Sequence, residues 1–453
     1  MPLILGTNSI KDTGYDVANS LRLDDSSNSH LSKSISGTNT TKLTISFWTK
    51  RTDGAGADDY LVFNSENNVS NYLSISFGNP KIDVQIGGTA NRRITNSVYR
   101  DQSAWYHVVI TFDTTQSTAS DRIKIYVNGV QETSFATSTT GMSQDSNLPA
   151  ISSTLDYAIG DYPSVSGFGY NGYLAEFCAL YGQALDPTSF GEFDEDSPTI
   201  WKPKDVSGLT FGTNGFYLDF EDSSALGNDV SGNNNDFTAN NLTAVDQSTD
   251  TCTNNFATLN PLVGGFSGTF SEGNTRSTLP PTNTSVVSNI NVNNGKWYCE
   301  FKYNTIAGYA VLGVAPMDQV IWVNNAAYYY STGATFGEDG TLFTSGTQSG
   351  TTITVSAGNV YGLMWDADNS ILKITDGTDT FQRSYTVNDT SIPIGFFFGG
   401  SSGSVTGDVS VNFGNPSFSI SSGNSDANGF GNFEYSVPSG FFSLCSKNLA
   451  ESG

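Results

Sequence analysis

The sequence is poor in the residues that build metal centres and covalent cross-links. Its 453 residues include 4 Cys and 2 His, and no two cysteines form a CxxC pair. A zinc site needs clustered Cys or His ligands, so we expect neither a zinc site nor a disulfide framework. We expect the cysteines to be free thiols inside the fold: Cys178, Cys252, Cys299 and Cys445.

Positive charge and long apolar runs are scarce as well. Lys and Arg number 20 against 44 Asp and Glu, which gives a formal net charge of -24. Because so acidic a chain repels a phosphate backbone, we expect no nucleic-acid partner. No apolar run is long enough for a membrane-spanning helix, so we expect no membrane insertion. The stretch from Met1 to Gly6 lacks the cationic leader of a secretory signal, so we expect exposure to the outside to come by assembly and release.

Aromatic residues are abundant and argue against a disordered chain, since they make up 12% of it, with 29 Phe and 21 Tyr. Helical periodicity is nearly absent, and alternating apolar and polar residues predict short antiparallel strands. Leu43, Ile45 and Phe47, for example, would share one face of a strand. Asn128 and Gly129 predict a two-residue hairpin turn. Further strands are expected at 73–77, 82–86, 123–127, 297–303, 311–314, 352–355, 360–365, 371–375 and 409–413.

A chain of 453 residues is too long for one ordinary core, since roughly 150 residues is a typical domain size. Many short strands separated by turns are typical of sandwiches and barrels. We therefore predict an all-β fold with two antiparallel β-sandwich domains of the jelly-roll type, joined by a linker rich in Asn and Asp. The expected organisation is an N-terminal attachment segment at 1–20, a sandwich at 21–195, a connector at 196–284 and a second sandwich at 285–453.

Three blocks in the first half carry a family resemblance. They are LTISFWTKR (43–51), WYHVVITFDTTQSTASDRIKIYVNGVQE (105–132) and YAIGDYPSVSGFGYNGYLAEFCALYGQAL (157–185). In this order they resemble the laminin-G-like branch of the concanavalin A-like lectin/glucanase superfamily. The resemblance implies a concanavalin A-like β-sandwich for the first domain.

Four blocks in the second half resemble the SPRY domain, which is also a β-sandwich. They are NGKWYCEFKY (294–303), VLGVA (311–315), GNVYGLMWDADNSILKITDG (358–377) and VSVNFGNPSF (409–418). The chain departs from the SPRY pattern at Ile374 and Asp376-Gly377, and Phe396 to Phe398 is unusually bulky. These departures leave the implied fold unchanged and put a shared mode of ligand binding in doubt.

The two domains in this order resemble virion proteins of tailed phages from marine environments. The resemblance implies a non-enzymatic protein located on the virion, either a tail-fibre or receptor-binding component or a capsid decoration. Its partners would be other virion proteins and a host-surface glycan, and it would form a homo-oligomer, with a trimer favoured. Two rival functions remain open: a hydrolase or lyase that degrades polysaccharide, and a structural subunit whose sandwiches bind other proteins.

Sugar binding normally uses the face of an aromatic ring with short polar side chains around it, and two segments offer this combination. In the second segment the consecutive residues Tyr328, Tyr329 and Tyr330 cannot all point to one face of a strand, so at least one of the three rings should be exposed. A subunit interface is the alternative, since Tyr and Trp are also enriched there. The candidate ligand-binding residues are Tyr157, Asp161, Tyr162 and Tyr170 in the first domain, and Trp322, Tyr328, Tyr329 and Tyr330 in the second.

We expect no cofactor, with calcium as the ion that the sequence could accommodate. Asp53, Asp58 and Asp59 lie in a Gly-rich loop, and calcium prefers clustered carboxylate and carbonyl oxygens. Asp side chains also stabilise turns without any metal, so both interpretations stay open.

We expect no catalytic residues. Glu192, Asp194 and Asp196 could share one face of a strand, as paired glycosidase carboxylates do. However, Glu195 stands where that strand needs an apolar anchor, and Gly191 and Pro198 around it indicate a loop. His107 lies in the Trp105-Tyr-His107 strand without a nucleophile motif nearby, which favours a structural histidine.

Overall fold

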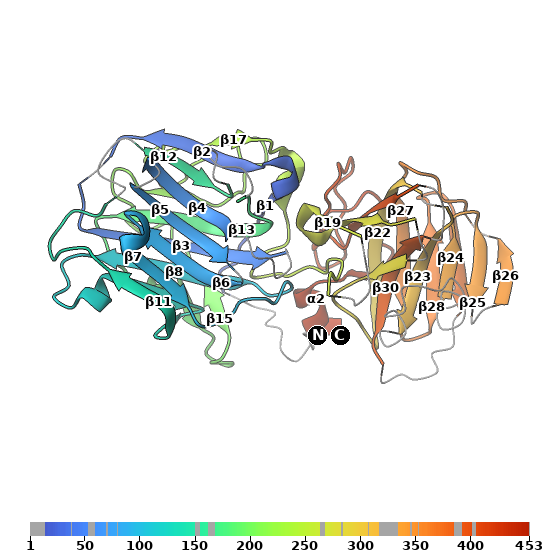
Figure 1. The fold of residues 1–453 in the computed structure, drawn as a ribbon. Helices are drawn as coiled ribbons and strands as arrows, with labels where there is room; N and C mark the ends of the chain where they lie inside the picture. Colours follow the sequence, from blue (N-terminus) through green and yellow to red (C-terminus); the bar gives the residue numbers. More distant parts are fainter. Residues whose placement is uncertain are drawn as a thin grey trace. The chain divides into compact units, whose positions relative to one another are not determined.

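The computed structural model describes residues 14–452 except 38, 53–58, 69–70, 79, 150–154, 162–167, 263–267, 282–283, 307, 317–333, 345–346, 352, 385–391 and 401–404. Within these residues the fold is nearly all-β, with one α-helix, α2 (Ser446–Ser452), which confirms the predicted fold class. None of the helices described is long and apolar enough to cross a membrane. The chain divides into two units between Thr253 and Asn254. We call them the N-terminal and the C-terminal unit (Figure 1).

The N-terminal unit contains two antiparallel sheets of eight strands that enclose one core. Sheet 1 has the order β10-β9-β8-β3-β13-β1-β18, with β16 beside β13, and sheet 2 has the order β11-β7-β6-β5-β4-β12-β2-β17. The strands of sheet 1 are β1 (Ser20–Leu23), β3 (Lys42–Arg51), β8 (Tyr106–Asp113), β9 (Ile123–Val127), β10 (Val130–Gln131), β13 (Gly172–Tyr181), β16 (Phe216–Leu218) and β18 (Gln247–Ser248). Those of sheet 2 are β2 (His30–Ile35), β4 (Asp59–Asn68), β5 (Asn71–Gly78), β6 (Lys81–Ile86), β7 (Asn91–Thr95), β11 (Phe135–Thr140), β12 (Leu155–Ile159) and β17 (Thr238–Asn240).

The core of this unit follows from the alternation in its strands. Ile45 and Phe47 of β3 are completely buried, as predicted. Phe47 stacks on Phe177 of β13 with ring centroids 5.2 Å apart, and Phe63 of sheet 2 lies 5.9 Å from Phe177. Burying each such ring contributes about 1.5–3 kcal/mol, so these contacts hold the two sheets together. The Asn128-Gly129 turn also forms as predicted, with positive φ at Asn128.

The segment that the sequence suggested as a connector is not a separate linker. Its first part adds strands to both sheets of the N-terminal unit: β16 pairs with β13, β17 with β2 and β18 with β1. The residues from Asn254 onward belong to the C-terminal unit. The expected boundaries at 196 and 284 are therefore replaced by a single boundary after Thr253.

The attachment segment expected at 1–20 is also partly integrated into the N-terminal unit. Val17 is buried and its amide donates to Thr253 Oγ1 at 3.1 Å. Tyr15 and Val17 pack with Trp48 and Trp201 in one apolar cluster. Residues 14–20 are therefore part of the folded unit, and residues 1–13 lie outside the described part of the chain.

Residues after β13 cover the outer face of sheet 1, which explains why β13 is buried along its whole length. Phe190, Val206, Phe211 and Tyr217 form an apolar layer on Cys178 of β13. The covering segment also forms a hairpin of β14 (Gly191–Phe193) and β15 (Trp201–Pro203). Short 3-10 helices of this unit are η2 (Asp25–Ser27), η3 (Gly88–Ala90), η4 (Ala119–Arg122), η5 (Pro187–Ser189) and η6 (Ala244–Asp246).

The C-terminal unit is a second sandwich of two sheets. Sheet 3 has the order β19-β20-β31-β22-β27-β28-β29, with β32 beside β22, and sheet 4 has the order β21-β30-β23-β24-β25-β26. Sheet 3 comprises β19 (Phe270–Ser271), β20 (Arg276–Leu279), β22 (Lys296–Thr305), β27 (Tyr361–Asp366), β28 (Ile371–Thr375), β29 (Thr380–Ser384), β31 (Gly407–Asn412) and β32 (Phe442–Ser443), and η7 (Glu272–Asn274) joins β19 to β20. Sheet 4 comprises β21 (Thr284–Val287), β23 (Ala310–Pro316), β24 (Ala334–Gly337), β25 (Thr341–Thr344), β26 (Thr347–Thr351) and β30 (Ile394–Gly400).

The core of the C-terminal unit joins its two sheets through aromatic rings. Phe301 of sheet 3 and Phe398 of sheet 4 have ring centroids 5.6 Å apart, and Trp297 and Trp365 are fully buried. The strand predicted at 352–355 is wrong, because residues 353–355 form no strand. Ile353 and Val355 are buried as part of a loop, in which the Val355 amide donates to the Glu338 carbonyl at 2.7 Å.

The cysteines confirm the expectation from the sequence. All four are free thiols. Three of them are buried and Cys252 is partly buried. Burial raises the pKa of the Cys445 thiol to about 11, so that thiol is neutral at physiological pH.

Candidate functional site

The outer face of sheet 2 carries a row of mostly polar residues that crosses all eight strands. On each strand the residues that alternate with the core residues point outward, and the strand register aligns them. One row crosses the whole sheet through adjacent pairs, such as Ala158 with Asn64 and with Ser32. From β17 to β11 this row consists of Thr238, Ser32, Ala158, Asn64, Ser74, Gln85, Arg92 and Thr139.

On β5 to β7 the outward side chains bind one another. Arg92 Nε donates to both carboxylate oxygens of Asp83, at 3.0 and 3.1 Å. Gln85 Nε2 donates to Asp83 at 3.3 Å, and the Tyr72 hydroxyl donates to Gln85 Oε1 at 2.9 Å. These contacts fill this half of the face with a paired network and leave little space for a ligand.

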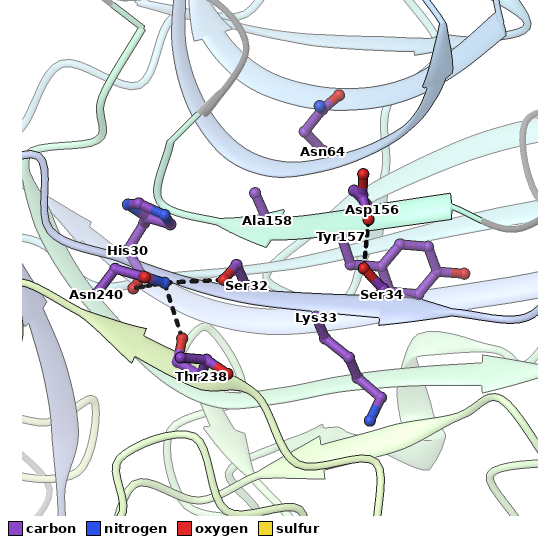
Figure 2. A pocket seen from close by; sticks show the side chains of 10 residues that line it. All are labelled: His30, Ser32, Lys33, Ser34, Asn64, Asp156, Tyr157, Ala158, Thr238 and Asn240. Carbon is purple, nitrogen blue, oxygen red and sulfur yellow. Dashed lines mark hydrogen bonds between the residues drawn. The ribbon is translucent and has the colours of Figure 1, made fainter.

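On β4, β12, β2 and β17 the residues of this row are short, and a groove of about 460 Å³ lies there, which we call groove 1. Ala158 lies near the middle of it, between Asn64 and Ser32 (Figure 2). A volume of this order is typical of a small-molecule site. The residues that line groove 1 are His30, Ser32, Lys33, Ser34, Asn64, Asp156, Tyr157, Ala158, Thr238 and Asn240.

Hydrogen bonds fix several polar groups around groove 1. The Ser34 hydroxyl donates to Asp156 Oδ1 at 2.5 Å, and Asn240 Nδ2 donates to Ser32 Oγ at 2.8 Å, as Figure 2 shows. His30 Nδ1 lies 3.0 Å from the Asn28 carbonyl. Since a carbonyl only accepts, Nδ1 carries a proton there, and Nε2 is the ring nitrogen left for another partner.

Asn64 differs from the other polar residues of the groove. It is 2% exposed, yet within the described part of the chain its side-chain amide has no hydrogen-bond partner. Asn64 lines groove 1, so its amide can contact a ligand that enters the groove.

Two of the aromatic residues singled out in the sequence belong to the core. Tyr157 is 1% exposed and bonds to the Tyr181 hydroxyl, and Tyr170 is fully buried and bonds to Thr49 Oγ1. Tyr157 lines groove 1, but its neighbours Asp156 and Ala158 are the residues of β12 that point outward. Tyr157 and Tyr170 therefore offer no exposed ring face to a sugar, and their prediction as ligand-binding aromatic residues is wrong.

Asp161, also a candidate, is buried near the edge of groove 1. Its carboxylate lies 3.8 Å from His30 Nδ1. Asp161 and burial together raise the pKa of the neighbouring Asp25, with burial as the larger cause. Asp161 thus contacts groove 1 through His30 rather than lining it.

The other residues chosen from the sequence cannot be placed. Tyr162, Trp322, Tyr328, Tyr329, Tyr330, Asp53 and Asp58 lie outside the described residues. Asp59 is the first residue of β4. Across the described part of the chain, no group of three or more His, Cys, Asp or Glu residues could hold a metal ion.

The carboxylates considered for catalysis lie in a surface hairpin away from groove 1. Lys202 Nζ lies 3.7 Å from Glu192 and 3.3 Å from Asp194. Asp194 Oδ1 also accepts the amides of Asp196 and Ser197, and these contacts lower the pKa of Asp194. Asp194 therefore acts as a turn residue, consistent with the loop expected from Gly191 and Pro198.

His107 is structural, as expected. It is 1% exposed, its Nδ1 accepts from Trp201 Nε1 at 3.0 Å, and its Nε2 lies 2.9 Å from Ser46 Oγ. Burial lowers the pKa of His107 to about 3, so the ring is neutral. It joins β8 to the segment that covers sheet 1.

Comparison with known proteins agrees with the fold. Residues 24–189 match the laminin G-like model of the concanavalin A-like lectin/glucanases superfamily. Over these residues the N-terminal unit is similar to concanavalin A-like lectin/glucanase domains. No significant match was found among curated proteins.

A search of solved structures gave matches of low identity and low TM-score. A heptameric SAP-like pentraxin from Limulus polyphemus is 15% identical, with 38% of this chain and 79% of that chain covered and a TM-score of 0.29. The SPRY domain of human HERC1 is 14% identical, with 34% and 96% covered and a TM-score of 0.26. Stonustoxin is 16% identical with a TM-score of 0.28, over 34% of this chain, and the match spans only 27% of the stonustoxin chain.

Proposed function

We propose that the N-terminal unit binds glycan in groove 1 without cleaving it. The observation that carries this proposal is groove 1 itself, in which the Asn64 amide lies beside a row of hydroxyl and amide groups. Glycans present many hydroxyl groups, and each can both donate and accept a hydrogen bond. The match to a lectin/glucanase superfamily is compatible with such a ligand.

The position of the polar groups on strands favours recognition by a preformed site. Ser32, Asn64 and Thr238 are held in register by the ladder of sheet 2, so little side-chain or loop ordering has to accompany binding. A shallow polar site of this kind binds weakly, and several copies in one assembly would increase the avidity.

The arrangement of acids supports binding rather than hydrolysis. Glycosidases use two carboxyl groups, separated by about 5–5.5 Å or about 6.5–9.5 Å. Among the residues that line groove 1, Asp156 is the one carboxylate, and its Oδ1 accepts the Ser34 hydroxyl. We therefore expect no product when the protein is incubated with laminarin, alginate or host polysaccharide.

A matched pair of Ala-to-Trp variants tests the proposal. Ala158→Trp would fill groove 1, while Ala136→Trp places the same ring at an exposed position on β11. On a glycan array we expect the wild-type chain and Ala136→Trp to bind the same glycans, and Ala158→Trp to lose the glycans that groove 1 binds. Equal binding by all three proteins, or no hit at high protein density, would contradict the proposal and favour a structural subunit.

We further propose that the protein acts on the surface of a virion, as a tail-fibre or capsid-decoration component, and that it forms a homotrimer with other virion proteins as neighbours. The resemblance of the two domains in this order to phage proteins supports the proposal, and the net charge of -24 suits a soluble surface protein. Light scattering should give three times the 48.3 kDa chain mass. Antibody labelling should decorate intact particles, and a monomer together with unlabelled particles would refute this placement.

A further inference from the structure

The C-terminal unit has a groove of its own, of about 520 Å³, which we call groove 2. It lies beside sheet 3, where the turn before β27 and the turn after β28 meet the segment 418–435. Its lining combines charged, short polar and aromatic side chains. The residues are Lys302, Gly358, Asn359, Val360, Tyr361, Asp376, Thr378, Phe418, Ser419, Ser421, Glu434 and Tyr435.

The wall formed by Tyr435 is held in place from three sides. Its hydroxyl donates to the Val360 carbonyl at 2.8 Å, and its amide donates to the buried Glu300 carboxylate at 2.8 Å. Its ring lies directly over Gly377, where a Cβ atom would come within 2.4 Å of the ring. Groove 2 is therefore preformed, which lowers the entropic cost of binding.

Groove 2 contains fixed charges of both signs. Asp376 accepts the amides of Thr378 and Asp379 at 2.9 and 2.8 Å, and Glu434 accepts the Ser421 amide at 2.7 Å. These hydrogen bonds lower the pKa of both carboxyl groups, so they are ionised at neutral pH. The ammonium group of Lys302 lies 4.9 Å from the centre of the Phe418 ring.

Several polar groups of groove 2 have unused hydrogen-bonding capacity. Within the part of the chain that the structure describes, the side chains of Asn359, Thr378 and Ser419 have no hydrogen-bond partner. Lys302 has no carboxylate within ion-pair distance among the same residues. Donors and acceptors of both neutral and charged types are thus available to one ligand.

We propose that groove 2 is a second binding site, for a neutral polyhydroxylated ligand, that is, a saccharide. Hydroxyl groups can donate to Asp376 and Glu434 and accept from Lys302, whereas an ion of either sign would be repelled by one part of the lining. The net charge of -24 further disfavours an anion. This inference goes beyond the proposed function, which concerns groove 1, and it makes the chain bivalent.

Titration calorimetry on the full chain with uncharged tetrasaccharides of the cello-, laminari-, manno- and xylo- series tests the inference. Ser419→Trp would fill groove 2, and Lys302→Met removes the ammonium group but keeps the aliphatic stem over Phe418. Ser425→Trp is the matched control, because Ser425 is exposed and does not line groove 2. Melting curves should show that all variants remain folded.

We expect at least one tetrasaccharide to bind the Ala158→Trp protein, in which groove 1 is filled. In that background Ser419→Trp should abolish the remaining binding, Lys302→Met should weaken it at least about tenfold, and Ser425→Trp should leave it unchanged. Binding that persists in Ser419→Trp, an equal loss in Ser425→Trp, or binding of a lysine-rich peptide alone would overturn the inference.

The outcomes for the two grooves are distinguishable. If Ala158→Trp loses all binding and Ser419→Trp binds as the wild type does, groove 2 is refuted and the proposed function stands. If Ser419→Trp loses binding and Ala158→Trp binds as the wild type does, groove 2 is supported and groove 1 is refuted as the glycan site. If none of the tetrasaccharides binds the wild-type chain at about 10 mM, where a site with a millimolar Kd would be filled, the inference is wrong.

Discussion

Replacing Glu176 by Gln should stabilise the protein at alkaline pH and change its stability little at acid pH. Glu176 lies in a β-bulge of β13, where the register with β3 shifts between Ala175 and Cys178, and its φ is 50°. Its side chain is 6% exposed. Its Oε2 accepts the Tyr217 hydroxyl at 2.7 Å and the Tyr15 hydroxyl at 3.2 Å.

The surroundings of Glu176 favour the neutral carboxyl. No cation bonds to it among the described residues, and the nearby charges are the carboxylates of Asp219 and Glu221. Burial is the main cause that raises the pKa of Glu176 from 4.5 to about 7. Below about pH 4.5 the group is protonated in both the folded and the unfolded chain, so its stabilising contribution is complete there. That contribution falls as the pH rises from 4.5 to about 7, where the folded chain also releases its proton, and it is constant above.

The magnitude follows from the shift. Each unit of pKa is worth about 1.4 kcal/mol, so the full loss is about 3 kcal/mol. Gln has nearly the same shape and accepts the same two tyrosine hydroxyls without a charge. The difference in free energy of unfolding between Glu176→Gln and the wild type should therefore increase by about 3 kcal/mol between pH 4.5 and about pH 8.

Urea titrations of both proteins across this pH range measure the difference, with amide exchange of β13 as a local probe. Glu192→Gln is the control, because Glu192 is about half exposed and near two lysines, and its replacement should change the stability by less than about 0.5 kcal/mol throughout. If the difference for Glu176→Gln changes by less than about 1 kcal/mol over the range, the carboxyl is not held neutral and the reasoning is refuted.

Three further predictions concern other buried or loop carboxylates. Asp250→Ala should destabilise the protein by about 3–5 kcal/mol in urea titrations, because it leaves the buried Lys50 ammonium without its partner and removes the acceptor of Trp105 Nε1; a loss below about 1 kcal/mol would contradict this. Glu300→Gln should destabilise by about 2–3 kcal/mol, because its carboxylate accepts four donors, two of them backbone amides, and an amide nitrogen cannot replace an accepting oxygen. Removal of calcium by EDTA should shift the melting temperature by less than about 1 °C, because Asp side chains such as those of Asp53, Asp58 and Asp59 can stabilise turns without a metal; a larger shift that calcium reverses would indicate a calcium site.

The strands could be predicted from the sequence because alternation is a local signal. Leu43, Ile45 and Phe47 alternate with polar residues, and their strand forms where it was expected. The division of the chain could not be predicted in this way. Strands β16, β17 and β18 have only 3, 3 and 2 residues, and they exist because they pair with β13, β2 and β1. A short segment does not show which strand it will pair with, even where it has strand character, as from Phe216 to Phe220, so the Asn- and Asp-rich sequence around these segments suggested a linker.

The candidate site was missed for a related reason. Ser32, Asn64, Ala158 and Thr238 are small or polar residues of four strands that are far apart in the sequence, and only the register brings them into one row. Alternation could have shown that each points away from the core, but not which neighbours it meets. The sequence directed attention to aromatic residues instead, and two of those, Tyr157 and Tyr170, are buried because the core of a sandwich also needs large rings.

The way the chain covers one sheet also determines which face of the N-terminal unit can bind a ligand. The outer face of sheet 1 carries Trp48, Val109 and Cys178, and the residues after β13 bury it under Phe211 and Trp201. The outer face of sheet 1 is therefore covered by the chain itself and is not open to a ligand at these residues. Sheet 2 has no comparable apolar outer layer among the described residues, and its outward row is polar from β17 to β11 except at Ala158. At one end of the row the long side chain of Arg92 pairs with the nearby Asp83 and fills the face. At the other end the side chains of the row are short, and groove 1 is left open. The position of the groove thus follows from side-chain length along one register row, which is why filling it at Ala158 is the decisive perturbation.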